Sequence, residues 1–186
     1  MSVYRNQNHI IFHESVSSVS IHELKKLINE INTELEDIYY NKLIQDITPK
    51  PIIIHIDTTG GELQPALYIY EAIRENKYPI YTVIDSGCSS AGSYIFLAGK
   101  KRYMRKYSSI MIHQHTVTFS DKKYDEMKND IKNDDMVYKH MVDIYHENSN
   151  LSKKEIKEML KIDKYMYPDD CFVNGFAHNY YDETEI

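Results

Sequence analysis

The sequence predicts an α/β fold of repeated strand-helix units, and the clearest unit lies between Ile52 and Ile84. Ile52 to Ile56 is short, β-branched and bounded by turn residues, which is typical of a buried strand. After Pro79, Ile80 to Ile84 has the same character. Between them, apolar residues recur at helical spacing: Leu63, Ala66, Leu67, Tyr70 and Ile73. A strand-helix-strand unit implies a parallel sheet, with ligands and catalytic groups beyond the carboxyl ends of its strands.

The residues before this unit predict one short strand and one long helix. Ile10 to Phe12 is a short apolar stretch. From Ser20 to about Asp46, apolar residues again follow helical spacing: Leu24, Leu27, Ile28, Ile31, Leu35 and Ile38. Ser20 and Glu23 have the spacing of a capping box, and Pro49 with Pro51 ends the helix.

The second half predicts one more strand and three helices. Ile110 to His113 is the strand, and Thr116 to Phe119 continues it in extended form. A long helix is expected from Asp121 to Asn148, and its many charges indicate that much of it projects from the core. Ser152 and Glu155 cap a shorter helix, and Pro168 and Gly175 frame the last one. The basic run at Lys100, Lys101, Arg102, Arg105 and Lys106 is interpreted as a solvated turn.

Length, composition and charge restrict the class of protein. With 186 residues and 42% apolar content, a single domain over residues 1–186 is expected. The net charge of -6 argues against nucleic acid as the partner. Two cysteines, Cys88 and Cys171, fit a reducing compartment. No signal peptide and no run long enough to span a membrane is present, so a soluble cytoplasmic protein is expected.

Candidate chemistry follows both strands of the central unit. Ser90 lies where a strand gives way to a helix, where free amides and the helix dipole would stabilise an oxyanion. Gly60 and Gly61 end the neighbouring strand, and a glycine amide can face a bound carbonyl without obstruction. The structural alternative is that Ser89 and Ser90 cap the helix while the glycines form a tight turn.

A serine nucleophile needs a base and an orienting carboxylate. His113 ends a predicted buried strand and is the candidate base, although a hydrogen-bonded core histidine is the simpler interpretation. His113 and His115 face the same way on an extended segment and could instead bind a metal, but no third ligand is evident. Asp163 lies between apolar stretches, so we expect it to be partly buried and paired. Asp57 is a weaker rival, and Asp169 with Asp170 fits the first turn of a helix.

Taken together, these segments resemble the Clp protease proteolytic subunit, a serine peptidase of the ClpP/crotonase superfamily. The resemblance covers roughly Ile10 to His178. The matching segments are Thr58-Thr59-Gly60-Gly61, Ser89-Ser90-Ala91-Gly92 with Ala98-Gly99, Met111-Ile112-His113-Gln114, and Asp163-Lys164-Tyr165 followed by Pro168 and Asn174-Gly175-Phe176. Their order, Ser, His, Asp, differs from that of chymotrypsin, subtilisin and the α/β-hydrolases.

The resemblance implies a ClpP-like fold in which Ser90 is the nucleophile, His113 the general base and Asp163 the orienting acid. The amides of Gly61 and Ala91 would form the oxyanion hole, with no metal and no cofactor. Peptides or unfolded proteins would be the substrates. Residues 116–160 would include the handle, the long helix through which two heptameric rings stack into a tetradecamer of identical chains.

Several positions depart from the family pattern. Thr58-Thr59 replaces Ser-Pro, Gly87 lies one residue nearer the nucleophile, and the glycine-rich strand after the histidine reads His115 to Phe119. Ile53 and His55 replace two aromatic positions of the groove that docks an AAA+ unfoldase ATPase, and only nine residues precede Ile10. Coupling to such an ATPase is therefore doubtful. Two alternatives stay open: a weak or inactive ring subunit that pairs with an active paralogue, and a crotonase-like enzyme acting on acyl-CoA.

Overall fold

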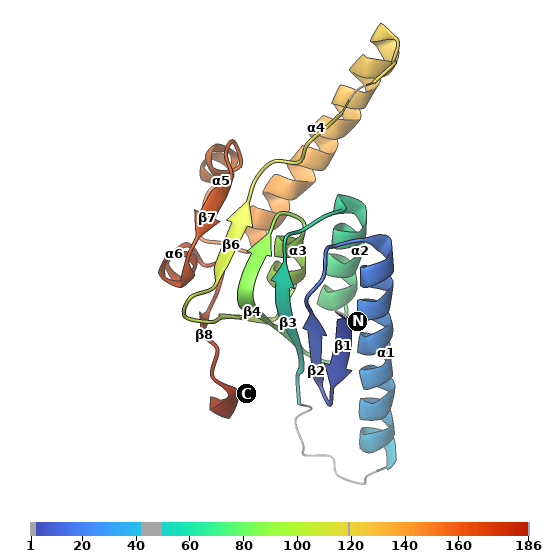
Figure 1. The fold of residues 1–186 in the computed structure, drawn as a ribbon, viewed down its shortest axis with the longest axis vertical. Helices are drawn as coiled ribbons and strands as arrows, with labels where there is room; N and C mark the ends of the chain where they lie inside the picture. Colours follow the sequence, from blue (N-terminus) through green and yellow to red (C-terminus); the bar gives the residue numbers. More distant parts are fainter. Residues whose placement is uncertain (1–2, 42–49, 119, 186) are drawn as a thin grey trace.

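The computed structural model describes residues 3–41, 50–118 and 120–185, with strands and helices alternating along the chain (Figure 1). The elements are β1 (Val3–Asn6), β2 (His9–Phe12), α1 (Ser18–Asn41), β3 (Ile52–Thr58), α2 (Leu63–Arg74), β4 (Ile80–Ser89), α3 (Gly92–Leu97), β5 (Lys101–Met104), β6 (Ser109–Ile112), α4 (Tyr124–Glu147), α5 (Lys153–Met159), β7 (Lys164–Met166), α6 (Pro168–Asn174), β8 (Asn179–Tyr180) and a 3-10 turn, Glu183–Glu185. The predicted α/β fold is confirmed.

One mixed sheet organises the chain. Its main path runs β1-β2-β3-β4-β5-β8, while β6 pairs with β4 and β7 pairs with β6. The pairs from β2 to β5, the β4–β6 pair and the β5–β8 pair are parallel, whereas β1 and β7 pair antiparallel with β2 and β6. The carboxyl ends of β3, β4 and β6 therefore point the same way.

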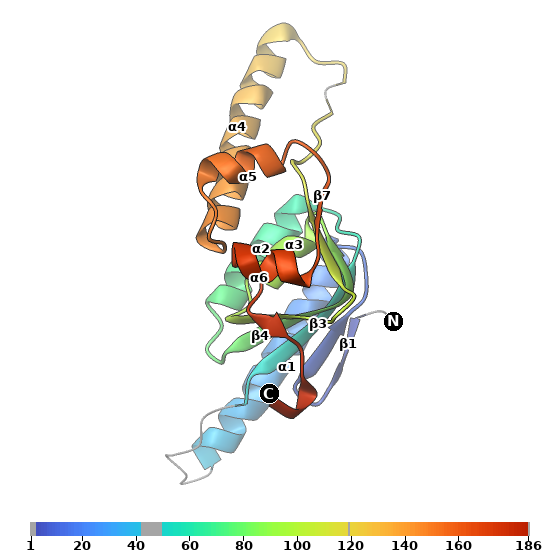
Figure 2. The ribbon, with the colours of Figure 1, turned by 90° about the vertical axis from the view of Figure 1, so that its left-hand side faces the viewer.

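Helices α1, α2 and α3 pack together beside the sheet, and their apolar residues join those of the central strands in one hydrophobic core (Figure 1). The long helix α4 extends away from the rest of the chain in both views (Figures 1 and 2). Only its inner end is buried, at Met141, Val142 and Tyr145. No helix in the described ranges is both long and apolar enough to cross a bilayer.

Local sequence signals predicted several element ends correctly. The long helix begins at Tyr124 and ends at Glu147, within three residues of the expected bounds. Ser152 accepts a hydrogen bond from Glu155 N and caps α5, and α6 begins at Pro168 and ends before left-handed Gly175. Residues 42–49, the expected end of the first long helix, lie outside the described residues. Residues 116–118, expected to be extended, form no strand, and Phe119 lies outside the described residues.

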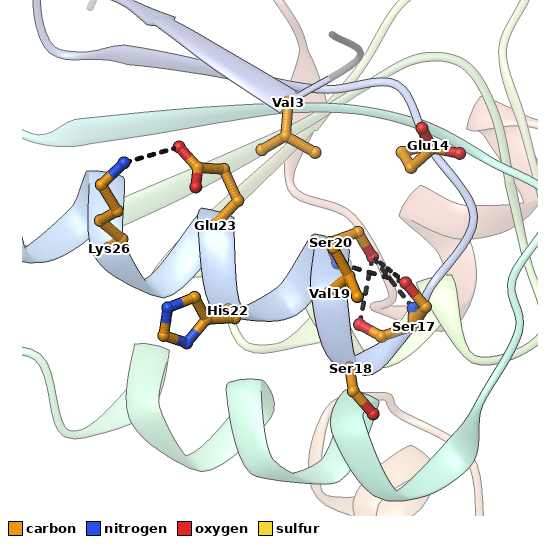
Figure 3. A pocket seen from close by; sticks show the side chains of 9 residues that line it. All are labelled: Val3, Glu14, Ser17, Ser18, Val19, Ser20, His22, Glu23 and Lys26. Carbon is orange, nitrogen blue, oxygen red and sulfur yellow. Dashed lines mark hydrogen bonds and ion pairs between the residues drawn. The ribbon is translucent and has the colours of Figure 1, made fainter.

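The predicted start of α1 is wrong, because Ser20 is not the N-cap residue of this helix. The helix begins at Ser18, and the cap is Ser17, whose hydroxyl accepts a hydrogen bond from Ser20 N (Figure 3). The Ser20 hydroxyl in turn accepts from Ser17 N at 2.9 Å. Glu23 pairs with Lys26 instead. Ser17 and Ser20 thus form a capping box in which the third helix position is a serine instead of a glutamate.

The strand expected over Ile80 to Ile84 is longer, since β4 continues to Ser89. This strand changes partners along its length: it pairs with β5 as far as Ile84 and with β6 from Gly87 to Ser89. The second partner comes from a distant part of the sequence, so a local pattern could not reveal it.

The basic run at 100–106 is a solvated turn only in part: Lys100, Lys101, Arg105 and Lys106 are exposed and residues 106–107 form a turn, but Arg102 is buried. It contains β5, and the Arg102 side chain points into the structure, where its guanidinium donates hydrogen bonds to Phe176 O and Gly175 O. Burial lowers the pKa of Arg102 to about 10. Arg102 therefore holds the C-terminal residues against the sheet. The short strands β1, β7 and β8 were also not expected.

A polar network lies on the sheet face opposite Ile54 and Ile56, since strand residues alternate between faces. His55 on β3 is buried, and its Nδ1 lies 3.1 Å from Asp85 on β4. Arg105 donates to the same carboxylate at 2.7 Å. Burial alone would raise the pKa of Asp85, but the hydrogen bonds from His55 and Arg105 outweigh it and lower this pKa to about 2.

We expect Asp85→Asn to lower the free energy of unfolding at pH 7 by about 2 kcal/mol. The folded pKa of about 2 lies below the ordinary 3.8, so this stabilisation is complete above about pH 5 and disappears as the pH falls through 2. Chemical denaturation of both proteins over this pH range measures the difference. Asp37→Asn, at an exposed carboxylate on α1, is the control and should change stability little. A constant difference between wild type and Asp85→Asn from pH 7 to pH 2 would contradict the assignment.

Candidate active site

The candidate residues gather where β3, β4 and β6 end, at the edge expected for a parallel sheet (Figure 1). Gly60 and Gly61 follow β3, Ser90 follows β4 and His113 follows β6. Asp163 directly precedes β7, which runs antiparallel to β6. Four segments far apart in the sequence thus contribute to one site.

Ser90 has a strained backbone. Its φ of 53° lies in the left-handed region, which costs a non-glycine residue roughly 1–3 kcal/mol. Hydrogen bonds hold it there: Ser90 N donates to Met111 O at 2.8 Å, and the Ser93 hydroxyl donates to Ser90 O at 2.6 Å. The Ser90 side chain does not cap α3, whose N-cap is Ala91. The helix-cap alternative is therefore not what the structure shows.

The glycine turn packs directly on the Ser90 backbone. Gly60 has a φ of 93°, and a Cβ atom there would lie 2.6 Å from Ser89 O and 2.8 Å from Ser90 Cβ. The Thr58 hydroxyl accepts a hydrogen bond from Gly60 N at 3.1 Å and shapes the turn. Within the described part of the chain, neither Gly61 N nor Ala91 N donates a hydrogen bond. The residue after Gly60 and the residue after Ser90 therefore each offer a main-chain amide that has no acceptor among the described residues.

His113 lies beside the Ser90 hydroxyl. The distance from His113 Nε2 to Ser90 Oγ is 2.7 Å. The register of β4 and β6 causes this approach, since it pairs Ser89 with Met111, two residues before the histidine. A tautomer with hydrogen on Nδ1 leaves Nε2 free to accept the hydroxyl proton. The structure therefore brings together the predicted nucleophile and base.

Asp163 is near the histidine, but it is not partly buried as expected. Its Oδ1 lies 3.3 Å from His113 Nδ1, while its side chain is 67% exposed. The flanking apolar residues Ile162 and Tyr165 are exposed as well, so they do not enclose the carboxylate. Water screens an exposed pair, which weakens its electrostatic effect. Asp163 is in position to orient the imidazole and is the least constrained of the three groups.

A cavity of about 300 Å³ opens beside the serine. Ser90 and His113 line it together with Met141 and Tyr145 from α4. Tyr145 also supports the nucleophile indirectly, because its hydroxyl is 2.7 Å from the Ser93 hydroxyl. Burial raises the pKa of Tyr145 to about 12, so the phenol stays neutral. The cavity is therefore lined by both the predicted nucleophile and the predicted base.

The other sequence candidates have different roles. Asp57 accepts a hydrogen bond from Gly87 N, Asp169 from the Tyr180 hydroxyl and Asp170 from Tyr167 N. Burial raises the pKa of the Cys88 thiol, which makes it a poor rival nucleophile.

The metal-ligand alternative pairs His115 with His113, whereas the ring of His115 contacts Met141 and Asp134. Among the residues that the structure describes, no group of three or more His, Cys, Asp or Glu side chains could hold a metal ion. Sequence reasoning missed Asp134 and Tyr145, because their spacing along α4 shows only a helix face.

A family model described as Clp protease matches residues 20–183 of the sequence. The chain belongs to the Clp protease family. The match includes the turn, the serine, the histidine and the aspartate segments described above. The resemblance stated from the sequence motifs is thereby confirmed.

Individual Clp proteins agree with this assignment. The chain is 28% identical over 173 residues to the ATP-dependent Clp protease proteolytic subunit of Deinococcus radiodurans, covering 87% of this chain and 83% of the relative. It is 37% identical over 93 residues to proteolytic subunit 2 of Treponema denticola, covering 47% and 46%. A solved structure of a ClpP1 mutant from Listeria monocytogenes superimposes with a TM-score of 0.77 at 17% identity, covering 93% of this chain and 90% of that one. This last likeness shows the fold.

In this Clp protease family member, Gly60→Ala should destabilise the fold by roughly 2 kcal/mol or more, because the new methyl group meets the nucleophile segment and the φ is unfavourable. Chemical denaturation measures the loss. Gly87→Ala is the matched control: its Cβ would meet only Asp57 Oδ1, at 3.7 Å, so a change below about 0.5 kcal/mol is expected. Equal losses from both substitutions would show that the close approach at Gly60 is unimportant.

Proposed function

We propose that this chain is a serine-type endopeptidase that cleaves peptides or unfolded proteins. The observation that carries the proposal is the 2.7 Å approach of His113 Nε2 to the hydroxyl of Ser90, a residue held at a φ of 53°. Strained backbone at a reactive group is typical of functional sites. Membership of the Clp protease family supports the same reaction class.

In the proposed reaction, Ser90 Oγ attacks the carbonyl carbon of the peptide bond while His113 Nε2 takes the hydroxyl proton. The C–N bond then breaks, and the same proton passes to the leaving amine. Water next attacks the acyl-serine ester, again with His113 as the base, and releases the acid and the free hydroxyl. Asp163 orients His113 and stabilises the imidazolium formed in each half of the reaction.

The oxyanion hole is assigned to the amides of Gly61 and Ala91. Neither donates a hydrogen bond within the described residues, so both are available to a developing oxyanion. The first amide belongs to a turn whose φ values, 93° at Gly60 and 149° at Gly61, suit glycine. The second amide directly follows the nucleophile, as in other serine hydrolases with a strand-to-helix elbow. No metal or cofactor is part of the proposed mechanism.

We extend the proposal to assembly of this single-domain chain into rings of identical subunits, as the resemblance implies for two stacked heptamers. The outer part of α4 supports this idea, because it exposes large apolar side chains at Tyr124, Ile131 and Met136. An isolated chain would leave these groups in water, which is unfavourable for a projecting helix. Substrate access would then be controlled by the assembly.

A catalytically weak ring subunit is the alternative favoured by one observation, the exposure of Asp163. A carboxylate in open solvent orients a histidine poorly. An AAA+ unfoldase ATPase is not part of the proposal. His55, at one of the positions read from the sequence as part of the family's docking groove, is buried and contacts Asp85 and His9.

A fluorophosphonate probe should label Ser90 in the assembled protein, and labelling should disappear in Ser90→Ala and His113→Ala. Loss of either group from such a triad lowers peptide hydrolysis by roughly a thousandfold or more. Asp163→Asn should reduce the rate less, because its exposed carboxylate is already screened. Mass spectrometry of the labelled peptide and hydrolysis of a fluorogenic peptide library measure both effects.

Analytical ultracentrifugation measures the oligomeric state of wild type and of each variant, so that only proteins in the same state are compared. Equal hydrolysis by wild type and Ser90→Ala would favour the inactive-subunit alternative. A folded, assembled wild type that neither reacts with the probe nor cleaves any peptide would refute the peptidase proposal.

A further inference from the structure

A second cavity, of about 440 Å³, lies at the opposite end of the sheet from the candidate active site. It is found where β4 and β5 begin, whereas Ser90 follows the other end of β4. Four of its lining residues are cations, Arg74, Lys77, Lys100 and Arg102, and no aspartate or glutamate is among the described residues that line it. The proposed peptidase mechanism uses none of these groups.

Arg102 is buried, with 8% of its surface exposed, but its hydrogen bonds do not use the whole guanidinium group. Nε donates to Phe176 O, while Nη2 donates to Gly175 O and, at 3.5 Å, to Asn148 O. Nη1 has no acceptor among the described residues, and it is not one of their fully buried unpaired atoms. Because buried polar groups are normally hydrogen-bonded, this nitrogen is available to a bound group.

The positive charges around the cavity lack neighbouring carboxylates. Lys77 pairs with Glu36 at 2.9 Å, but the ion pairs of the described residues include none from Arg74, Lys100 or Arg102. Burial, and after it the charge of Arg74, lowers the pKa of Arg102 to about 10. The two guanidinium groups therefore repel each other, and an anion between them would relieve this repulsion.

Helix ends account for part of this charge. Arg74 lies in the last turn of α2, Lys100 follows the end of α3, and Arg102 donates to carbonyls at the ends of α4 and α6. Each helix end carries roughly half an elementary negative charge, so four ends offset at most about two of the three unpaired cations. A net positive charge of about one therefore remains beside a buried arginine.

We propose that this cavity binds the phosphate group of a small phosphorylated molecule, with Arg74, Lys100 and Arg102 Nη1 as the donors. A phosphate ester carries a charge of about -1.5 to -2 and three acceptor oxygens, which matches three cations better than a carboxylate with one charge and two oxygens does. Guanidinium groups suit phosphate oxygens in geometry as well as in charge. The volume lies within the roughly 300–1,000 Å³ of small-molecule sites and exceeds that of a phosphate alone.

The test measures binding of pyrophosphate and of citrate to the full chain by isothermal titration calorimetry at constant ionic strength. Pyrophosphate should bind at one site per chain, and more tightly than citrate. Arg74→Gln and Lys100→Gln, both at exposed positions, should each raise its Kd roughly tenfold. Lys101→Gln is the matched control, because it removes the same charge from an exposed neighbour that does not line the cavity. Its Kd should stay within about twofold of wild type.

Thermal denaturation gives a second measurement that needs no peptidase activity. Pyrophosphate should raise the melting temperature of wild type and Lys101→Gln, and the shift should be lost in the double variant Arg74→Gln with Lys100→Gln. Absence of pyrophosphate binding to folded wild type would overturn the inference. An equal weakening by Lys101→Gln would also overturn it, because the attraction would then be diffuse surface charge. Binding of citrate as tight as that of pyrophosphate would refute the assignment to phosphate. None of these outcomes depends on whether Ser90 cleaves peptides.

Discussion

The parallel pairing of β4 with β6 is the contact on which the candidate site depends. It sets Ser89 beside Met111 and lets Ser90 N donate to Met111 O. Because successive strand residues point to opposite faces, a shift of one residue would turn His113 away from the serine. Burial fixes the register, since Cys88, Ile110 and Ile112 are all inaccessible to solvent. The packing that buries these three side chains therefore also brings the imidazole to the hydroxyl.

The strain at Ser90 is maintained by groups from several elements. Ser93 on α3 donates to Ser90 O, and Tyr145 on α4 holds the Ser93 hydroxyl. Gly60 on the neighbouring turn leaves just enough room for the Ser90 backbone. Strained conformations persist only where the surrounding contacts over-determine them. The inner end of α4 is thus part of the support of the nucleophile, while its outer end is exposed.

Local signals in the sequence predicted what local interactions determine. Pro168 and Gly175 predicted α6, and the motifs around Ser90 and His113 predicted which groups would meet. The errors concern contacts between distant segments. The length of β4 depends on β6, and Arg102 is buried because carbonyls of residues 175 and 176 accept its hydrogen bonds. The apolar stretches around Asp163 predicted its burial, but only their outer members, Leu160 and Met166, are buried, while the nearer Ile162 and Tyr165 are exposed.

The groups of the site are held with unequal firmness, and the difference has a consequence for the proposed peptidase. Ser90 and His113 follow strands whose core-facing side chains, among them Cys88, Ile110 and Ile112, are fully buried, so their mutual geometry is tied to the core. Asp163, by contrast, precedes the short strand β7, and its side chain is exposed. Electrostatic effects between exposed groups increase when water is excluded from around them. Any surface that covers β7 would therefore strengthen the electrostatic effect of Asp163 on His113.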